Sequence, residues 1–360
     1  MKREDYAQLH VVWGEGYDEI SFTPFSLRDE WTLARRLFYE KYLGFLRRTF
    51  KVEVHEVKRY PESVLLLAHD KEYVDYVKRM SELGAGLLDY GDTPAYPGVF
   101  EKALLAVSGT LTLADILVKA GRGVAFNPQG GFHHARRRSA GGFCVFNDVA
   151  VAARYVRERG YERVAIIDVD AHHGDGTQEI LYRDPLLKVS VHGYGYGFYP
   201  GTGWIDELGE GDGLCMNINV PIPLTSADDV FELVVRELLA PLISSYSPDF
   251  VIVQSGVDAY RGDPLVGLRL TDNSYKVFAE FLSGIAARGV PVLLTGGGGY
   301  QPEVTARTWA FILSCVAGRC LEELGPLDEK TSSDRKTVEI VSSRIDYLLR
   351  SLKECEVKKR

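Results

Sequence analysis

Short apolar runs alternate with longer amphipathic segments along most of the chain. The runs are continuously apolar and rich in β-branched residues, which is typical of parallel strands buried on both faces. The predicted strands are residues 64–67, 123–126, 163–168, 188–191, 216–220, 250–254 and 290–295. Helical periodicity between them predicts helices at residues 27–43, 73–83, 99–118, 149–159, 227–243, 274–287 and 304–316.

This alternation of strands and helices predicts an α/β fold of three layers, with a mostly parallel central sheet between two layers of helices. Repeats, low-complexity tracts and Pro/Ser-rich linkers do not divide the chain, so we expect one domain over residues 1–360. The tail, about residues 321–360, is charged but carries spaced apolar side chains. We expect a final amphipathic helix there, docked on the surface.

Composition narrows the class of protein. The 360 residues are 46% hydrophobic and carry 42 basic against 50 acidic side chains, a net charge of −8, which excludes disordered and fibrous proteins. Because nucleic-acid binding relies on neutralising phosphates, an acidic chain is not expected to bind nucleic acid. Residues 103–120 are interrupted by Asp115 and Lys119 and fall short of the ~20 apolar residues of a membrane span, so none is expected.

The five cysteines, at positions 144, 215, 315, 320 and 355, are sparse and lack CxxC spacing. Such a set favours neither a disulfide framework nor a thiolate zinc site. The charged first ten residues also lack the apolar stretch of a secretory signal. Together these features lead us to expect a protein of the reducing cytoplasm.

Unusual polar residues follow four of the predicted strands. Residues 127–134 read NPQGGFHH, residues 168–176 read DVDAHHGDG, residues 255–258 read SGVD, and residues 296–300 read GGGGY. In open α/β sheets, ligands bind beyond the carboxyl ends of the strands. Five of the eight histidines lie within residues 133–192, in or next to these segments, so we expect a site there.

Asp168, Asp170 and His172 have the spacing of metal ligands. In an extended strand, side chains two apart point the same way, so these three would converge. Two carboxylates and an imidazole suit a divalent ion with an open position, zinc first, with iron(II), cobalt or manganese as alternatives. Asp258, which ends another strand, is the natural further ligand. The alternatives are a hydrogen-bonded carboxylate pair or helix-capping aspartates.

The paired imidazoles of His133 and His134 follow two glycines and indicate a general base and a general acid, with Asp168 and Asp175 available to orient them. A packed structural pair is the alternative. Tyr300 follows four glycines, which suits a backbone that passes close to a ligand. Its hydroxyl is a candidate donor to a polarised carbonyl and to the oxyanion that follows.

With these residues in view, the chain resembles the histone deacetylase superfamily, which includes acetoin-utilisation proteins and acetylpolyamine amidohydrolases. The matching blocks run in the family's order, at residues 92–95, 130–135, 142–148, 168–176, 198–203, 258–264 and 296–300. The resemblance implies an arginase/deacetylase-like α/β fold. It also implies a metal-dependent amidohydrolase that removes acetyl or other acyl groups from lysine side chains or related amines.

Residue by residue, the resemblance implies zinc held by Asp170, His172 and Asp258. It implies a catalytic group of His133 paired with Asp168, His134 paired with Asp175, and Tyr300 as the oxyanion donor. The implied substrate contacts are Asp92 at the rim and Gly142, Phe143, Tyr199 and Leu265 along the acyl-lysine tunnel. Some members also bind potassium near Asp168, Asp170, His172 and Ser190.

The expected partners are an acetylated lysine protein or an acetylated small amine, with a homo-oligomer as a further expectation. Three other functions stay open. The chain would otherwise be an acetylpolyamine or other small-molecule amidohydrolase, an arginase-like ureohydrolase with two metal ions, or a non-catalytic module that binds acyl amines. A dinuclear manganese site would need a further His and an Asp pair, whereas the residue two positions after Asp258 is Tyr260 and not a second Asp. A binding module would not need His133, His134 and Tyr300 together.

Overall fold

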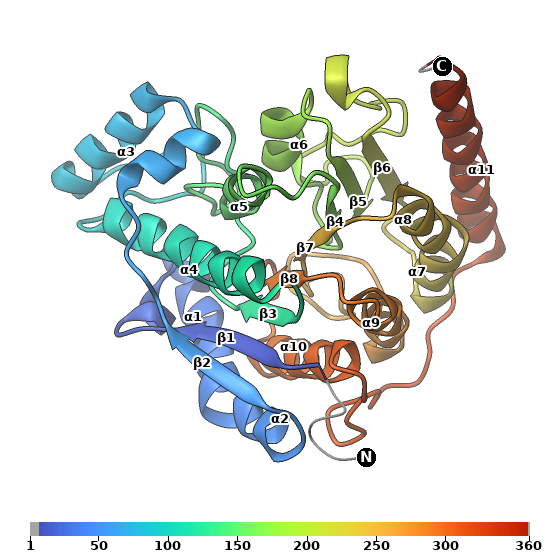
Figure 1. The fold of residues 1–360 in the computed structure, drawn as a ribbon, viewed down its shortest axis with the longest axis horizontal. Coiled ribbons are helices and arrows are strands. Elements are labelled where there is room, and N and C mark those ends of the chain that lie inside the picture. The colour runs from blue at the N-terminus through green and yellow to red at the C-terminus, as the bar shows by residue number, and fades with distance from the viewer. Residues whose placement is uncertain (1–6, 359–360) are drawn as a thin grey trace.

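The computed structural model describes residues 7–358. Residues 1–6, which belong to the charged start considered above, lie outside the described residues. The described chain is built around one sheet of eight parallel strands, in the order β2-β1-β3-β8-β7-β4-β5-β6 (Figure 1). The strands are β1 Leu9–Trp13, β2 Val52–Glu56, β3 Val124–Asn127, β4 Val164–Asp168, β5 Leu187–Gly193, β6 Asn217–Ile222, β7 Phe250–Gln254 and β8 Val292–Thr295.

Helices cover both faces of this sheet, so the predicted three-layer α/β fold is confirmed. One face packs against α3 Lys71–Leu83, α4 Val99–Ala120, α5 Asp148–Arg157 and α6 Asp175–Leu181. The other packs against α2 Leu43–Thr49, α7 Asp228–Val234, α8 Ala240–Tyr246, α9 Asp272–Ala286, α10 Pro302–Val316 and α11 Arg335–Lys358. Helix α1, Arg28–Leu37, packs on α10.

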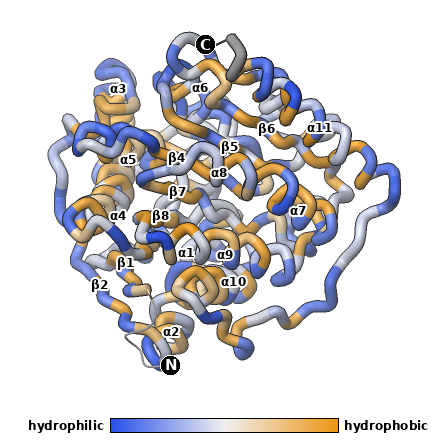
Figure 2. Tube along the Cα trace, turned by 45° about the vertical axis from the view of Figure 1, so that its right-hand side comes forward, coloured by the Kyte–Doolittle hydropathy of each residue, from blue (hydrophilic) through white to orange (hydrophobic). Residues whose placement is uncertain are grey.

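Apolar side chains fill the space between the layers. Strands β4, β7 and β8 are buried along their whole length. In Figure 2 the apolar colour gathers along these central strands, while hydrophilic positions lie mostly towards the edge of the molecule. Burial on both faces explains why continuous apolar runs located these strands in the sequence.

Several expected elements differ in the structure. Residues 64–67 are not a strand but part of a short 3₁₀ helix, η5 Glu62–Leu67. Strands β1 and β2 were not predicted. β2 reads VEVHE, and as the edge strand it need not be apolar throughout. The helices expected at 27–43 and 227–243 each contain a π-helical turn, η4 Phe38–Tyr42 and η7 Val235–Leu239. The remaining 3₁₀ turns are η2 Tyr17–Glu19, η3 Phe25–Leu27 and η6 Gly211–Gly213.

Helix α4 is longer than the apolar stretch recognised in the sequence. It has 22 residues and a mean hydropathy of 1.6 in its most apolar window, enough by length and composition to cross a membrane. However, 61% of that window is buried inside the protein, where α4 packs against α5, β1 and β3. It therefore has the character of a core helix.

The cysteine prediction was wrong, because four of the five cysteines form disulfides. Cys215 pairs with Cys355 and Cys315 pairs with Cys320, while Cys144 is free and buried. The first pair joins the loop before β6 to α11 over 140 residues of chain, a proximity that spacing alone could not reveal. Cysteine usage therefore no longer argues for a reducing compartment.

Candidate active site

Four loops meet in one cavity at the carboxyl ends of the adjacent strands β3, β8, β7 and β4. The cavity has a volume of about 240 Å³. It contains the predicted metal ligands, both tandem histidines, Tyr300 and the five predicted substrate contacts. Its lining consists of Trp31, Asp92, Gly131, Phe132, His133, His134, Gly142, Phe143, Cys144, Asp170, His172, Tyr199, Asp258, Leu265, Gly297, Gly298 and Tyr300.

Asp170, His172 and Asp258 form a group whose ligand atoms all lie within 4.8 Å of one another. His172 Nδ1 lies 2.8 Å from Asp258 Oδ2 and 3.2 Å from Asp170 Oδ1. Asp168 does not join this group, so the three-residue convergence expected from strand alternation was wrong. The reason is that β4 ends at Asp168, and the chain leaves the extended conformation before Asp170.

The electrostatics of this group suit a bound cation. Burial and the charge of Asp170 raise the pKa of Asp258 to about 6. Burial opposes the charge of His172, but the carboxylates of Asp258 and Asp170 outweigh it and raise the pKa of His172 to about 10. Two buried carboxylates require a positive charge beside them, and the raised pKa of His172 reflects this requirement. A divalent ion, which two carboxylates and one imidazole suit, would take the place of that proton. The residues present therefore fit a metal site.

The glycine-rich loop after β8 leaves room for these carboxylates. The backbone N–H of Gly298 donates to Asp170 Oδ2 at 2.8 Å, as does the side-chain amide of Gln254. A Cβ atom on Gly298 would lie only 2.4 Å from Asp258 Oδ2. The glycine run was expected to let backbone pass close to a ligand. At Gly298 it does so, because a residue with a side chain would clash with Asp258.

The tandem histidines each pair with a different carboxylate. His133 Nδ1 lies 2.7 Å from Asp168 Oδ2, and His134 Nδ1 lies 2.7 Å from Asp175 Oδ1. The two imidazole centroids are 4.1 Å apart. Because each Nδ1 is engaged, each ring has only Nε2 left for other contacts. Arg136 binds the remaining oxygen of Asp175 through Nε and Nη2, at 3.1 and 2.6 Å.

The two imidazoles differ in protonation. Burial disfavours charge on His133, but Asp168 and Asp170 outweigh this and raise its pKa to about 9. Burial and the neighbouring charge of His133 lower the pKa of His134 to about 4, despite its bond to Asp175. The pair is thus asymmetric, with the pKa raised at His133 and lowered at His134.

Asn147 and Asp148, which the sequence analysis noted only within a matching block, hold the histidine loop in place. The carboxylate of Asp148 accepts the backbone N–H groups of Gly131 and Phe132 at 2.9–3.1 Å. Asn147 caps α5 by accepting the N–H of Ala150, and its amide donates to the carbonyl oxygens of His133 and Ala135. The start of α5 therefore fixes the backbone that carries both imidazoles.

Not every histidine of the cluster faces the cavity. His173 bonds to Thr202 and Gln178, and His192 bonds to Ser190 and the carbonyl oxygen of Gly203. Neither belongs to the cavity lining. These two side chains are buried parts of the surrounding framework.

Tyr300 stands at the end of the glycine-rich loop with its ring in the cavity. Its backbone N–H donates to Asp263 Oδ2 at 2.9 Å, and its ring lies 6.2 Å from those of Trp31 and Phe143. Burial, reinforced by the charges of Asp258 and Asp170, raises the pKa of Tyr300 well above its ordinary value. The hydroxyl therefore keeps its proton and is able to donate it in a hydrogen bond.

Sequence reasoning missed Arg35, a fully buried side chain of α1. Its guanidinium lies between the rings of Trp31 and Trp309 and donates to the carbonyl oxygens of Gly297, at 2.9 Å, and Pro128, at 3.2 Å. Burial lowers its pKa to about 9. Arg35 thus ties the glycine-rich loop to the loop before the histidines. An arginine in an amphipathic helix gives no sign of this role.

The rim and walls of the cavity are formed by the remaining predicted residues. Tyr199 is 42% exposed, and its ring centroid lies 5.0 Å from that of His134. Phe143 has a φ of +62°, a conformation that is uncommon for a bulky residue, and it lines the cavity beside Tyr300. Leu265 is 40% exposed at the mouth. Burial and the charge of Asp89 raise the pKa of Asp92 to about 6.

Comparison with known proteins shows the family of this chain. The family profile of the histone deacetylase domain matches residues 36–316. The chain is 38% identical over 265 residues to the acetoin utilization protein AcuC of Bacillus subtilis, covering 70% of this chain and 68% of that one. It is 32% identical over 261 residues to histone deacetylase 8 of Xenopus laevis, covering 70% and 79%.

A probable deacetylase of Archaeoglobus fulgidus is 34% identical over 265 residues, covering 72% of this chain and 68% of that one. Among solved structures, the HDA15 HD domain superposes with a TM-score of 0.82 at 27% identity, covering 98% of both chains. The similarity therefore spans the sheet and all four loops that form the cavity.

Proposed function

The chain belongs to the histone deacetylase family of hydrolases, and from this premise we propose that it hydrolyses the acyl amide of an acylated lysine side chain, using a single divalent metal ion. The observation that carries the proposal is the meeting of three groups in one cavity: Asp170 with His172 and Asp258, the tandem histidines, and Tyr300.

Asp170, His172 and Asp258 would hold the ion, and zinc fits their donor set best. When bound there, it would supply Lewis-acid polarisation of the acyl carbonyl and lower the pKa of water. Tyr300 donates its hydroxyl hydrogen to the carbonyl oxygen and stabilises the negative charge that develops on that oxygen.

His134 moves the protons. Its Nδ1 is held by Asp175, so Nε2 receives the proton of the attacking water and returns it to the leaving amine. His133, held by Asp168, lies next to it and stabilises the developing negative charge. Phe143 and Tyr199 enclose the aliphatic chain of the substrate, and Asp92 binds its backbone at the rim.

An acylated polyamine is the second candidate substrate. Leu265 at the mouth is apolar and 40% exposed, so this position offers no carboxylate to a second ammonium group. This favours acyl-lysine. We also propose a potassium ion near Asp168 and Ser190, where a cavity of about 20 Å³ lies beside both residues. The cytoplasmic location, the homo-oligomer and the lack of nucleic-acid binding stay predictions from the sequence.

Acetate release from an acetyl-lysine peptide and from an acetylated polyamine tests the proposal directly. The protein would be stripped with a chelator and reconstituted with zinc, iron(II) or cobalt. We expect peptide turnover that disappears with the metal and returns with reconstitution. If only the polyamine is turned over, the substrate class is acylated polyamines and not acyl-lysine. If the peptide binds tightly but is not turned over with any of the metals, the chain is a binding module.

A further inference from the structure

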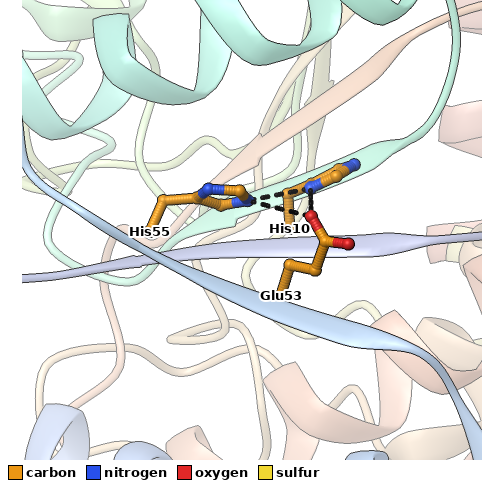
Figure 3. A group of neighbouring side chains, drawn as sticks. All are labelled: His10, Glu53 and His55. Carbon is orange, nitrogen blue, oxygen red and sulfur yellow. Dashed lines mark hydrogen bonds and ion pairs between the residues drawn. The ribbon is translucent and has the colours of Figure 1, made fainter.

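A second group of metal-ligating side chains lies on the β1–β2 edge of the sheet, outside the lining of the catalytic cavity. It consists of His10 in β1 and Glu53 and His55 in β2. His10 is the register partner of Glu53, and Glu53 and His55 are two residues apart, so all three project from the same face of the sheet. Figure 3 shows the Glu53 carboxylate turned towards both imidazoles.

Three atoms of this group form a compact triangle. His10 Nδ1 and His55 Nε2 are 2.9 Å apart, and Glu53 Oε2 lies 3.8 Å from the first and 3.9 Å from the second. The point equidistant from the three atoms is about 2.1 Å from each of them. Zinc takes histidine nitrogen at about 2.0–2.1 Å and carboxylate oxygen at about 2.0–2.2 Å. The spacing of the three atoms therefore matches the bond lengths of a zinc ion placed between them, in exchange for the hydrogen bond between the two rings.

Hydrogen bonding alone accounts for only part of this arrangement. One imidazole N–H shared between His10 and His55 satisfies the contact of 2.9 Å. The two distances to Glu53 Oε2 exceed those of a hydrogen bond, so the carboxylate faces two ring nitrogens without a bond from either. Lys51 Nζ lies 3.1 Å from the other oxygen, Oε1, and leaves Oε2 for a ligand.

The protonation state of the histidines also suits metal binding. Burial, reinforced by the neighbouring imidazole, lowers the pKa of His10, and burial lowers the pKa of His55. His10 is buried, whereas the side chains of Glu53 and His55 are 40% and 26% exposed. An ion can thus enter from solvent and keep a position open to water.

We propose that His10, Glu53 and His55 bind a divalent transition-metal ion, zinc first, at a site separate from the catalytic one. Two imidazoles and one carboxylate select ions of this class over calcium or magnesium. β2 is paired only through β1, since it is the outermost strand of the sheet. The bound ion would cross-link the two strands and hold the edge strand in register.

Metal counting on the full chain tests this site without relying on activity. The stripped protein would be titrated with zinc, and bound metal measured by elemental analysis after removal of free ions. We expect two ions per chain in the wild type and one in His55→Ala. Glu53→Gln keeps the shape of the side chain and should weaken the second site about 10-fold or more. Glu56→Gln, on the exposed end of the same strand, is the matched control and should keep two ions.

Cobalt provides an independent readout. Its visible absorption should contain a second component, saturating separately from the first, that is lost in His55→Ala and kept in Glu56→Gln. If His55→Ala does not fold, the metal content and cobalt spectrum of Glu53→Gln test the site by themselves. An ion count per chain that is the same in the wild type, His55→Ala and Glu53→Gln would overturn the proposal. Deacetylase activity is not involved, so failure here is distinguishable from failure of the proposed function.

Discussion

His134 and Asp175 are joined by a hydrogen bond of 2.7 Å between Nδ1 and Oδ1, and Arg136 occupies the other oxygen of the same carboxylate. The carboxylate lies almost wholly out of solvent. Burial opposes its charge, but His134 and Arg136 outweigh this and lower the pKa of Asp175. A permanently charged Asp175 fixes the proton on Nδ1 and directs Nε2 of His134 to the substrate.

Asp175→Asn should therefore lower kcat by about 10- to 100-fold with little change in KM, because the amide no longer enforces this tautomer. Steady-state kinetics on an acetyl-lysine peptide would measure the effect. Glu179→Gln is the control, since Glu179 is an exposed carboxylate that also lies near Arg136. A folded Asp175→Asn protein with wild-type kcat would contradict the role given to this pair.

Tyr300→Phe removes only the hydroxyl that would donate to the developing oxyanion. We expect kcat to fall by about 100- to 1000-fold while KM changes by less than about threefold. Tyr199→Phe removes a hydroxyl from the exposed wall of the same cavity and should leave kcat nearly unchanged. A loss confined to KM in Tyr300→Phe would mean that the hydroxyl binds the ground state instead.

Asp92 should make substrate binding depend on pH. Its pKa is raised to about 6, so the carboxyl is neutral below that pH and charged above it. The ratio of kcat/KM between the wild type and Asp92→Asn should rise from near 1 at pH 5 to about 10 at pH 8, the effect of a charge-assisted hydrogen bond. A ratio that does not change with pH would exclude ionised Asp92 from binding.

His69 should make the stability of the fold depend on pH. Its Nε2 accepts the backbone N–H of Asn147, and its Nδ1 contacts the carbonyl oxygen of Arg136. Burial lowers the pKa of this ring from 6.5 to about 4, against the contact with Arg136, so the ring is neutral at neutral pH. The unfolded state binds the extra proton first. The contribution of His69 to the free energy of unfolding is fully present above pH 6.5. It is lost as the pH falls towards 4, and its size is about 3 kcal/mol.

Urea unfolding at several pH values measures this contribution. The difference in the free energy of unfolding between the wild type and His69→Gln should be largest above pH 6.5 and shrink towards pH 4. His134 titrates in the same range but is common to both proteins, so it cancels in the difference. A difference that stays constant with pH would show that His69 is not the titrating group.

The disulfide between Cys215 and Cys355 should stabilise the docking of α11. Val341, Ile345 and Leu348 bury the apolar face of this helix, and the disulfide closes a loop of 140 residues. In the chain-entropy model such a crosslink contributes up to about 5 kcal/mol. Cys355→Ser should lower Tm, and Cys215→Ser/Cys355→Ser should lower it by no more than the single variant. Equal Tm values for oxidised wild type and Cys355→Ser would contradict a stabilising role.

The sequence predicts the fold best for strands that helices cover on both faces. β7 was predicted with its observed bounds, because a strand covered by helices on both faces must be apolar throughout. β2 was not predicted, because it alternates polar and apolar side chains at the edge of the sheet. Residues 64–67 were mistaken for a strand because a short apolar run does not distinguish a strand from a single helical turn.

The sequence by itself determined which residue types lie at the carboxyl ends of the strands, since local order along the chain places the histidines, aspartates and glycine-rich run directly after apolar strands. Tertiary structure decided which of them meet. It paired Asp168 with His133, brought Asp258 to His172, and set Arg35 against Gly297 across 262 residues of chain. It also brought His10 to His55. Such contacts depend on strand order and helix packing, which join segments whose separation along the chain carries no local signal.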